Sequence, residues 1–355
     1  MYIQKLLLKG GRFFDGEKFA KKDLLLENGT IKEIGKIDCP DALKIDVSGL
    51  IVCSGLVDIH AHLLEMGNTQ FGFPTEMACL PFGVAYAVDV CAELGNLDVV
   101  DFNNVKSKLF IPIMVKGNVL DYESMKKRID YYGERCIGIK VFFDKEQFDY
   151  ITKEHLVLAC ELAKKHGLKV MVHSTGSDIP MSEIVEVLDK GDILTHVYHG
   201  GRNSVCENDY YAYKLAKNKG VVLDVGMAGG VHTDFKILKD AIKKGFIPDT
   251  ISSDLTLYSA YMRGGIYGLT TCLSVLKKLG MKEKDVINCV TKNAVKAITS
   301  PNWFNVNVGD NATLTCLKYG KVNVDLTDKS KNRLKIKKGY TCKLTVVNGR
   351  ILYRS

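Results

Sequence analysis

Six residues of this 355-residue chain are our candidates for binding metal ions or moving protons, and each lies in or just after a short apolar run. They are His60, His62, Lys140, His173, His196 and Asp254. A neutral imidazole offers one lone pair to ions such as zinc, and a carboxylate offers an oxygen. Because side chains alternate along a strand, His60 and His62 point the same way and can bind one ion together. The pattern therefore predicts a metal site.

Lys140 is unusual because it lies inside the apolar sequence Gly138-Ile139-Lys140-Val141-Phe142-Phe143. An unpaired ammonium group is costly to bury. We therefore expect Lys140 to be paired, to have a shifted pKa or to be covalently modified. A structural ion pair is the alternative to a role in the site.

The middle of the chain contains eight apolar runs separated by roughly 23 to 32 residues, close to the length of one βα unit. The runs are Ile51–Val57, Val84–Val90, Leu109–Val115, Ile137–Phe143, Leu168–Val172, Ile193–Val197, Val221–Val225 and Thr250–Ser253. An open, doubly wound sheet also alternates in this way, but eight units with polar residues at the run ends favour a (β/α)8 TIM barrel. The carboxyl ends of barrel strands meet at one mouth, which would bring the six residues together.

Helical patterns lie between the runs. The segment Thr152–Lys165 has Thr152 as its N-cap and Gly167 just past its end, which are typical helix start and stop signals. Similar patterns predict helices over residues 181–190 and 234–244, each followed by a glycine. His155 and His166 fall on the first of these helices, and we expect both to be surface histidines.

The two ends of the chain have a different texture. Both alternate apolar and polar residues and contain an Asn-Gly pair, at Asn28-Gly29 and Asn348-Gly349. Asn-Gly between apolar runs is a strong hairpin signal. We therefore predict a small β-sandwich domain formed by residues 1–52 and 305–355, and a barrel over residues 53–304.

Composition places the chain among ordinary globular enzymes, with 46% hydrophobic and 25% charged residues. No apolar run is long enough to span a bilayer, and the N-terminus is typical of a strand rather than of an export signal. We therefore expect a cytoplasmic protein without a membrane partner. The 11 cysteines are odd in number and form no CxxC pair, which predicts reduced core residues rather than a disulfide framework.

The formal net charge of +8 comes mostly from lysines in clusters on predicted helix faces. Nucleic-acid binding surfaces concentrate charge in a stripe, usually with arginine, so the sequence argues against such a partner. Solvated helix faces explain most of the excess. The positive field also suits a small anionic substrate.

The chemical residues and their order resemble the amidohydrolase superfamily over essentially the whole chain. The matching pieces are Gly55-Leu56-Val57-Asp58-Ile59-His60-Ala61-His62, Lys140, Val172-His173, Thr195-His196 and Ser252-Ser253-Asp254. The flanking β domain from both chain ends matches as well. The resemblance implies a hydrolase that acts on carbon–nitrogen or ester bonds and often assembles as a homo-oligomer.

The resemblance also implies a role for each matching residue. Lys140 would react with carbon dioxide, and its carbamate would bridge two divalent ions, usually zinc. His60, His62 and Asp254 would hold the first ion, and His173 and His196 the second. A hydroxide between the ions would attack the substrate carbonyl, while Asp254 carries its proton to the leaving group. Two ions polarise a carbonyl and lower the pKa of bridging water, and a nearby carboxylate is a competent proton relay.

Departures from the family pattern narrow the substrate. Dihydroorotases usually carry arginine two residues after the first histidine pair, where this chain has Leu64, and often follow the last aspartate with histidine, where it has Leu255. Lys140 argues against mononuclear deaminases. The segments 195–203 and 248–255 resemble a deacetylase-type branch, which implies hydrolysis of an amide or ester acyl group from a small carboxylic acid.

Several alternatives stay open. They are a dihydroorotase-like cyclic amidohydrolase, an adenine deaminase-like enzyme, a binuclear iron or manganese purine deaminase, and a non-catalytic barrel scaffold. Scaffold relatives typically lose metal ligands, whereas the full set is present here.

Substrate contacts are expected in the loops that follow the runs. The candidates are Arg202, which can bind a carboxylate with two hydrogen bonds, His199, Asn203, Tyr258 and Arg263. The alternative for each is a loop residue that faces water. His232 follows the seventh run and is a further candidate for the barrel mouth. The long stretch Leu63–Gly83 is typical of a lid or a specificity loop.

Overall fold

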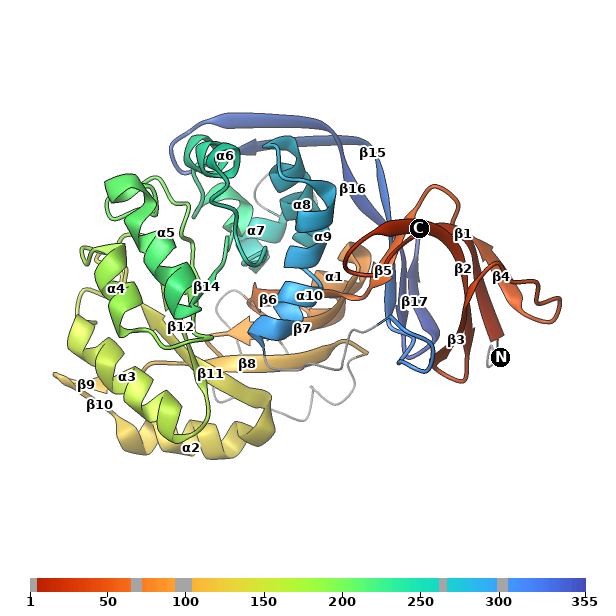
Figure 1. Cartoon of the computed structure of the whole chain (residues 1–355). Coiled ribbons are helices and arrows are strands. Elements are labelled where there is room, and N and C mark those ends of the chain that lie inside the picture. Colours follow the sequence, from red (N-terminus) through yellow and green to blue (C-terminus); the bar gives the residue numbers. More distant parts are fainter. Residues whose placement is uncertain (1–4, 65–71, 93–103, 262–266, 299–305) are drawn as a thin grey trace.

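The computed structural model describes residues 5–64, 72–92, 104–261, 267–298 and 306–355. Its centre is a seven-stranded parallel sheet in the order β14-β13-β12-β11-β8-β7-β6. The strands are β6 (Leu56–Ala61), β7 (Val84–Val90), β8 (Lys106–Pro112), β11 (Cys136–Phe142), β12 (Lys169–His173), β13 (Ile193–Thr195) and β14 (Val222–Leu223). Figure 1 shows this sheet surrounded by helices. Seven of the eight predicted apolar runs therefore supply its strands.

The eighth run closes the sheet into a barrel. On one side the backbone N–H of Asp254 donates to His60 O at 2.7 Å, and that of His62 donates to Leu255 O at 2.9 Å. On the other side Val225 N–H donates to Thr250 O at 3.3 Å. Residues 250–255 thus lie between β6 and β14, as an eighth barrel strand would, although they pair through isolated bridges. The predicted barrel architecture is confirmed.

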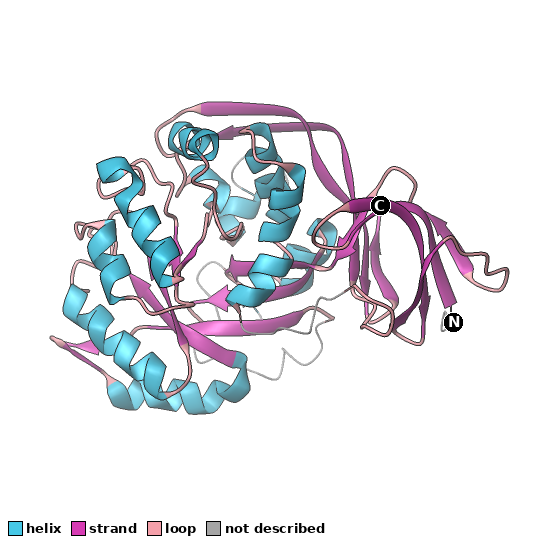
Figure 2. Cartoon of the chain, in the orientation of Figure 1, coloured by secondary structure: helices cyan, strands magenta, loops and turns pink. Residues whose placement is uncertain are grey.

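Helices cover the outer face of the barrel, as Figure 2 shows. They are α1 (Thr75–Cys79), α2 (Tyr122–Tyr132), α3 (Lys153–Lys165), α4 (Met181–Val187), α5 (Glu207–Lys219), α6 (Phe235–Lys244), α7 (Leu257–Tyr261), α8 (Leu269–Lys278), α9 (Glu283–Cys289) and α10 (Lys292–Ala297). Short 3-10 turns are η2 (Leu80–Phe82), η4 (Gly133–Arg135) and η5 (Ala228–Gly230), and a two-residue hairpin joins β9 (Val115–Lys116) to β10 (Val119–Leu120). The apolar faces of the helices pack on the strands in one large core, which holds the strands in place.

Two of the three helices that the sequence predicts begin and end within a residue of the predicted bounds. Thr152 forms a capping box at α3, and Asp234 caps α6 by accepting from two backbone N–H groups. The helix predicted to reach residue 190 ends at Val187, because Leu188 has extended backbone angles. The prediction that His155 lies at the surface was wrong. Its imidazole completes the α3 capping box by accepting from Thr152 N–H, and its other nitrogen contacts Gly117 O at 3.1 Å.

Both ends of the chain join in one eight-stranded sheet, ordered β17-β16-β15-β5-β1-β2-β3 with β4 beside β1. The strands are β1 (Lys5–Phe14), β2 (Phe19–Glu27), β3 (Thr30–Gly35), β4 (Leu43–Asp46), β5 (Ile51–Ser54), β15 (Leu314–Thr327), β16 (Arg333–Val347) and β17 (Arg350–Arg354). The sheet curls until its β3 edge meets the segment just before β15. There Ile31 N–H donates to Asp310 O at 2.8 Å. The predicted sandwich is thus one continuous sheet around its own core.

The two Asn-Gly turns lie against each other at the surface of this domain. All four residues have positive φ, as a tight hairpin turn requires. A side chain at Gly349 would lie 2.8 Å from Gly29 Cα. Glycine at this position therefore lets the two ends of the chain meet.

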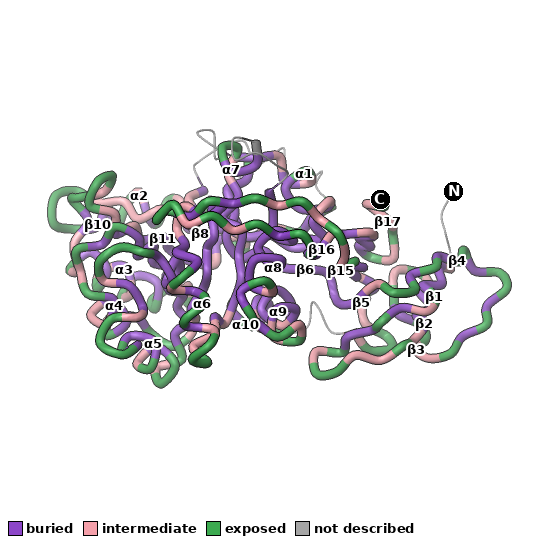
Figure 3. The backbone as a smooth tube through the Cα atoms, turned by 90° about the horizontal axis from the view of Figure 1, so that it is seen from above, coloured by how far each residue is buried: buried purple, intermediate pink, exposed green. Residues whose placement is uncertain are grey.

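The hairpin of β15 and β16 leaves the β domain and crosses over the barrel to α6 and α8, as Figures 1 and 3 show. Tyr340 N–H in β16 donates to Ser274 Oγ in α8 at 2.8 Å. At the tip of the hairpin, Lys329 N–H donates to Gly230 O in η5 at 2.9 Å. The sequence analysis did not predict this hairpin, which connects the β domain to the loops above the barrel.

Two expectations about the chain concern its cysteines and membranes. All 11 cysteines are free thiols, and most are buried, as predicted. Among the described residues, no helix is long and apolar enough to cross a membrane.

Part of the predicted lid, residues 65–71, lies outside the described residues. Residues 75–82 of that stretch form α1 and η2.

Candidate metal centre

His60, His62 and Asp254 meet at the carboxyl end of β6. Oδ1 of Asp254 lies 3.2 Å from His60 Nε2 and 3.1 Å from His62 Nε2. All three side chains are buried. Their potential ligand atoms lie within 4.8 Å of one another, so the group has the size of a site for one metal ion.

His173 and His196 form the second part of the site, at the ends of β12 and β13. Their ring centroids are 4.6 Å apart. His173 Nε2 lies 2.9 Å from Thr175 O, and His196 Nδ1 lies 2.7 Å from Gly226 O. A carbonyl oxygen only accepts hydrogen bonds, so each ring donates from one nitrogen, and in the neutral imidazole the other nitrogen keeps its lone pair for a metal. Burial lowers the pKa of both imidazoles well below the usual value, which favours their neutral form.

Lys140 lies between the parts of the site. Its side chain is fully buried, and Nζ is 3.3 Å from His60 Nε2 and 5.5 Å from the centre of the Phe142 ring. Burial lowers the pKa of Lys140 to about 8. In the part of the chain that the structure describes, no carboxylate lies within ion-pair distance of Nζ. This does not match the structural ion pair considered as the alternative.

The backbone bends sharply where two of these residues are placed. His196 has a φ of 63° and Asp254 a φ of 48°, both in the left-handed region. Such a conformation costs about 1 to 3 kcal/mol for a residue other than glycine and is concentrated at functional sites. Both residues with this strained backbone are candidate metal ligands.

A buried carboxylate, Asp224, supports His60 through Thr195. It was not among the site residues predicted from the sequence. Asp224 is fully buried and accepts from the hydroxyls of Thr195 at 2.7 Å and Ser252 at 2.6 Å. Thr195 Oγ1 also lies 3.3 Å from His60 Nδ1. Because the Thr195 proton is directed to Asp224, His60 Nδ1 must be the donor to Thr195. A neutral His60 that donates from Nδ1 carries its lone pair on Nε2, the nitrogen that lies beside Lys140 and Asp254.

We expect Thr195→Val to weaken metal binding without a change of shape. The substitution keeps the volume but leaves His60 Nδ1 without its acceptor and Asp224 without one donor. Loss of such an outer contact typically lowers metal affinity about 10- to 100-fold. Thr195→Ser keeps the hydroxyl and should restore the affinity. Titration of the metal-free protein with zinc checks this, and a wild-type affinity in Thr195→Val would contradict the relay.

Asp58 fixes the other side of the site. It accepts from Ser253 Oγ at 2.5 Å and from Ser253 N–H at 3.0 Å. Burial raises the pKa of Asp58 to about 6. These bonds tie β6 to the residue directly before Asp254, which explains how the two neighbouring segments keep their register.

A cavity of about 360 Å³ opens above the histidines. Its wall includes Phe142, Phe148, Asp144, Tyr258 and His232. Of the predicted substrate contacts, the structure places Tyr258 on this wall. The others are not among the described wall residues: Arg202 is exposed, His199 is buried, and the Asn203 side-chain amide donates to Ser177 O. Arg263 lies outside the described residues.

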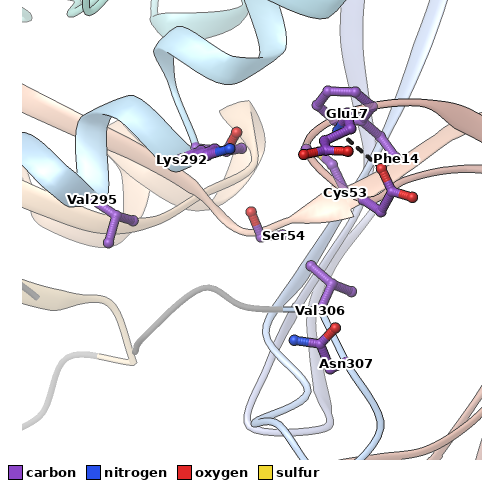
Figure 4. A pocket seen from close by; sticks show the side chains of 11 residues that line it. Phe14, Glu17, Cys53, Ser54, Lys292, Val295, Val306 and Asn307 are labelled. Atoms are coloured by element: carbon purple, nitrogen blue, oxygen red, sulfur yellow. Dashed lines mark hydrogen bonds between the residues drawn. The ribbon is translucent and has the colours of Figure 1, made fainter. Parts of the chain in front are cut away.

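A second cavity, of about 450 Å³, lies where the β domain meets the barrel (Figure 4). Phe14, Glu17, Cys53, Lys292 and Val306 are among its lining residues. Cys53 precedes the start of β6, so this cavity lies at the end of the strand opposite the histidines. Its described lining contains no histidine.

The sequence is similar to deacetylases and dihydroorotases of bacteria. It is 27% identical to a deacetylase of Brucella anthropi, over 87% of this chain and 82% of that protein. It is 25% identical to a deacetylase of Agrobacterium fabrum, with 97% and 89% covered. A dihydroorotase of Geobacter metallireducens is 38% identical, over 77% of this chain and 80% of that protein. No protein-family model matches the sequence.

Solved structures show the same fold. A dihydroorotase crystal structure superposes with a TM-score of 0.86 at 23% identity, covering 99% of this chain and 98% of that one. An adenine deaminase gives a TM-score of 0.83 at 22% identity, with 99% of each chain covered. At these identities the likeness establishes the architecture of barrel and β domain.

Proposed function

The chain belongs to the amidohydrolase superfamily, and from this premise we propose that it removes an acyl group from a small molecule by hydrolysis of an amide or ester bond. Enzymes of this superfamily use divalent metal ions. The observation that carries the proposal is the meeting of His60, His62 and Asp254 with His173 and His196 around the buried Lys140.

We propose that this cluster holds two divalent ions, with zinc as the metal for tests, and that Lys140 would join them as a carbamate. His60, His62 and Asp254 are the proposed ligands of the first ion, and His173 and His196 of the second. Imidazole nitrogens and carboxylate oxygens are ligands that suit zinc. When bound, the ions supply an activated water and polarise the acyl carbonyl.

The protein side chains supply the remaining steps. Asp254 is the proposed proton carrier, because its carboxylate lies on the cavity wall beside the histidines. Phe142 and Phe148 stack with their ring centroids 4.9 Å apart and offer an apolar surface to the substrate. The polar groups of Thr256 and Ser259 line the same wall and can orient the acyl compound.

The residues at two positions of the family pattern favour a deacylase over a dihydroorotase. Leu64, at the position where the family pattern has an arginine, is 45% exposed, and Leu255, at the position of the family histidine, is buried. The names of the deacetylase relatives support the same choice.

The first test is the metal content of protein purified without a chelator. We expect about two divalent ions per wild-type chain and a sharp fall in Lys140→Ala, because the bridge between the ions is lost. Lys145→Ala is the matched control, since Lys145 is exposed and pairs with Asp178 at the surface. No stoichiometric metal in folded wild type, reconstituted with zinc and bicarbonate, would overturn the proposal in favour of a scaffold.

Turnover of a panel of candidate substrates identifies the type of bond that the enzyme hydrolyses. The panel contains N-acetyl amino acids and O-acetyl hydroxy acids, each beside its methyl ester, together with dihydroorotate, hydantoin and adenine. Release of acetate supports the deacylase, and a preference for free acids over their esters supports the expected anionic substrate. Turnover of the ring compounds alone would replace the deacylase by a cyclic amidohydrolase or a deaminase.

A further inference from the structure

His232 lies between β14 and α6 and lines the cavity above the metal centre. Its side chain is 20% exposed, so it lies between the buried ligands and the open part of the cavity. No role was assigned to it by the ligand pattern of the sequence. Its surroundings are those of a metal ligand.

The geometry groups His232 with His173 and His196. The His232 ring centroid is 4.3 Å from that of His196 and 4.9 Å from that of His173, while His173 and His196 are 4.6 Å apart. One nitrogen from each ring lies within 4.8 Å of those of the other two. The three rings are therefore nearly equidistant, as imidazoles around one ion would be.

The ring nitrogens of His232 also support its grouping with the two histidines. In the described part of the chain, its Nδ1 is buried without a hydrogen-bond partner. Its Nε2 is 3.8 Å from Asp254 Oδ2, which is beyond hydrogen-bond distance. A buried polar atom without a partner is costly and needs an explanation. A bound ion, or a group that reaches the ring when the ion binds, would supply one.

The loop that carries His232 is fixed on both sides by the tip of the long β15–β16 hairpin. Before it, Gly230 O accepts from Lys329 N–H at 2.9 Å. After it, Phe235 N–H donates to Asp328 at 2.8 Å. Gly230 has a φ of 99°, and a side chain there would lie 2.9 Å from Thr327 O. The β domain thus fixes the loop backbone on both sides of His232, and a fixed backbone preorganises the ligand that it carries.

We propose that His232 is a third imidazole ligand of the second metal ion, beside His173 and His196. The inference rests on the proposed function, because it needs a metal-loaded site. Three neutral imidazoles are a known ligand set for catalytic zinc. The hairpin of the β domain then becomes part of the metal site, because it positions one of the ligands.

The test compares metal binding by wild type, His232→Asn and His166→Asn. Metal-free protein is titrated with zinc against a chromophoric chelator, and then with cobalt while the visible absorption is recorded. We expect two ions per wild-type chain and a loss of at least about tenfold in the affinity of one of them in His232→Asn. The cobalt spectrum should change with it. His166 is exposed at the end of α3, so His166→Asn should match wild type.

A second measurement needs no variant and is unaffected if His232→Asn fails to fold. Side-chain nitrogen NMR of zinc-loaded wild type counts the imidazoles that bind metal. Five metal-bound rings support the proposal, and four rings with a free His232 overturn it. Unchanged affinities and cobalt spectrum in His232→Asn would also overturn it, even if KM rises. A wild type that binds no ion would overturn the proposed function as well, so the two failures differ.

Discussion

Asp254→Asn is expected to lower kcat by about 10²- to 10⁴-fold, the usual contribution of a positioned general acid or base. The substitution removes one negative charge but keeps the shape of the side chain. Asparagine tolerates the left-handed backbone that Asp254 adopts, with its φ of 48°. The loss of activity should therefore come from chemistry and metal binding rather than from strain.

The amide should also weaken the first ion. In the folded chain Asp254 Oδ1 lies beside both His60 Nε2 and His62 Nε2. A neutral amide oxygen is a poorer partner for a divalent cation there than a carboxylate. Zinc titration should show one weakened ion, while the ion held by His173 and His196 is less affected.

Asp234→Asn is the matched control. Asp234 is also buried, and it caps α6 next to the loop of His232. Asparagine is as good an N-cap as aspartate, so this variant should fold and retain activity. The measurement is steady-state turnover of the best acyl substrate in the panel, with metal content and thermal unfolding recorded in parallel. Wild-type kcat in Asp254→Asn would exclude Asp254 as the proton carrier.

The grouping of the candidate ligands could be predicted from the sequence because barrel geometry places the ends of all strands at one mouth. Carboxyl ends of parallel strands converge, so residues at those ends, such as His173 and His196, meet whatever lies between them. The alternation of side chains did the same for His60 and His62. The apolar runs also located the eighth barrel segment, although it pairs only through bridges.

The network behind His60 could not be predicted in this way. Asp224 meets Thr195 and Ser252 only because three neighbouring segments have one particular register, which a single sequence does not reveal. One signal was present: Asp224 lies within an apolar run, as Lys140 does. A buried charge in such a run requires partners, and the same argument applies to both residues.

The hairpin over the barrel was missed for a different reason. Residues 321–327 and 333–337 alternate polar and apolar residues as strands do, but their many lysines suggest a solvated hairpin, and the alternation does not say on which elements the hairpin packs. Its contacts with η5 and α6 are made by backbone groups and by Asp328. Backbone contacts leave little trace in the sequence, and so His232 could not be connected with the β domain.

Gly226→Ala is expected to disrupt the metal centre by adding a single methyl group. Gly226 has a φ of 52°, and its carbonyl accepts from His196 Nδ1 at 2.7 Å. An added Cβ would lie 2.6 Å from His196 Cε1 and would also overlap Thr195 Oγ1. Both side chains must then move, so the second ion loses a ligand and His60 loses its support. We expect no stoichiometric second ion and a markedly lower thermal unfolding temperature.

Gly245→Ala separates this overlap from backbone strain. Gly245 ends α6 with a φ of 88°, and a Cβ there would meet no atom within 4 Å. Its substitution should cost about 1 to 3 kcal/mol for the left-handed backbone alone. Gly226→Ala carries the same strain plus the overlap, so the difference in unfolding temperature between the two variants measures the overlap. If Gly226→Ala unfolded like Gly245→Ala and still bound both ions, the close packing of Gly226 against His196 and Thr195 would not be needed to hold the metal site.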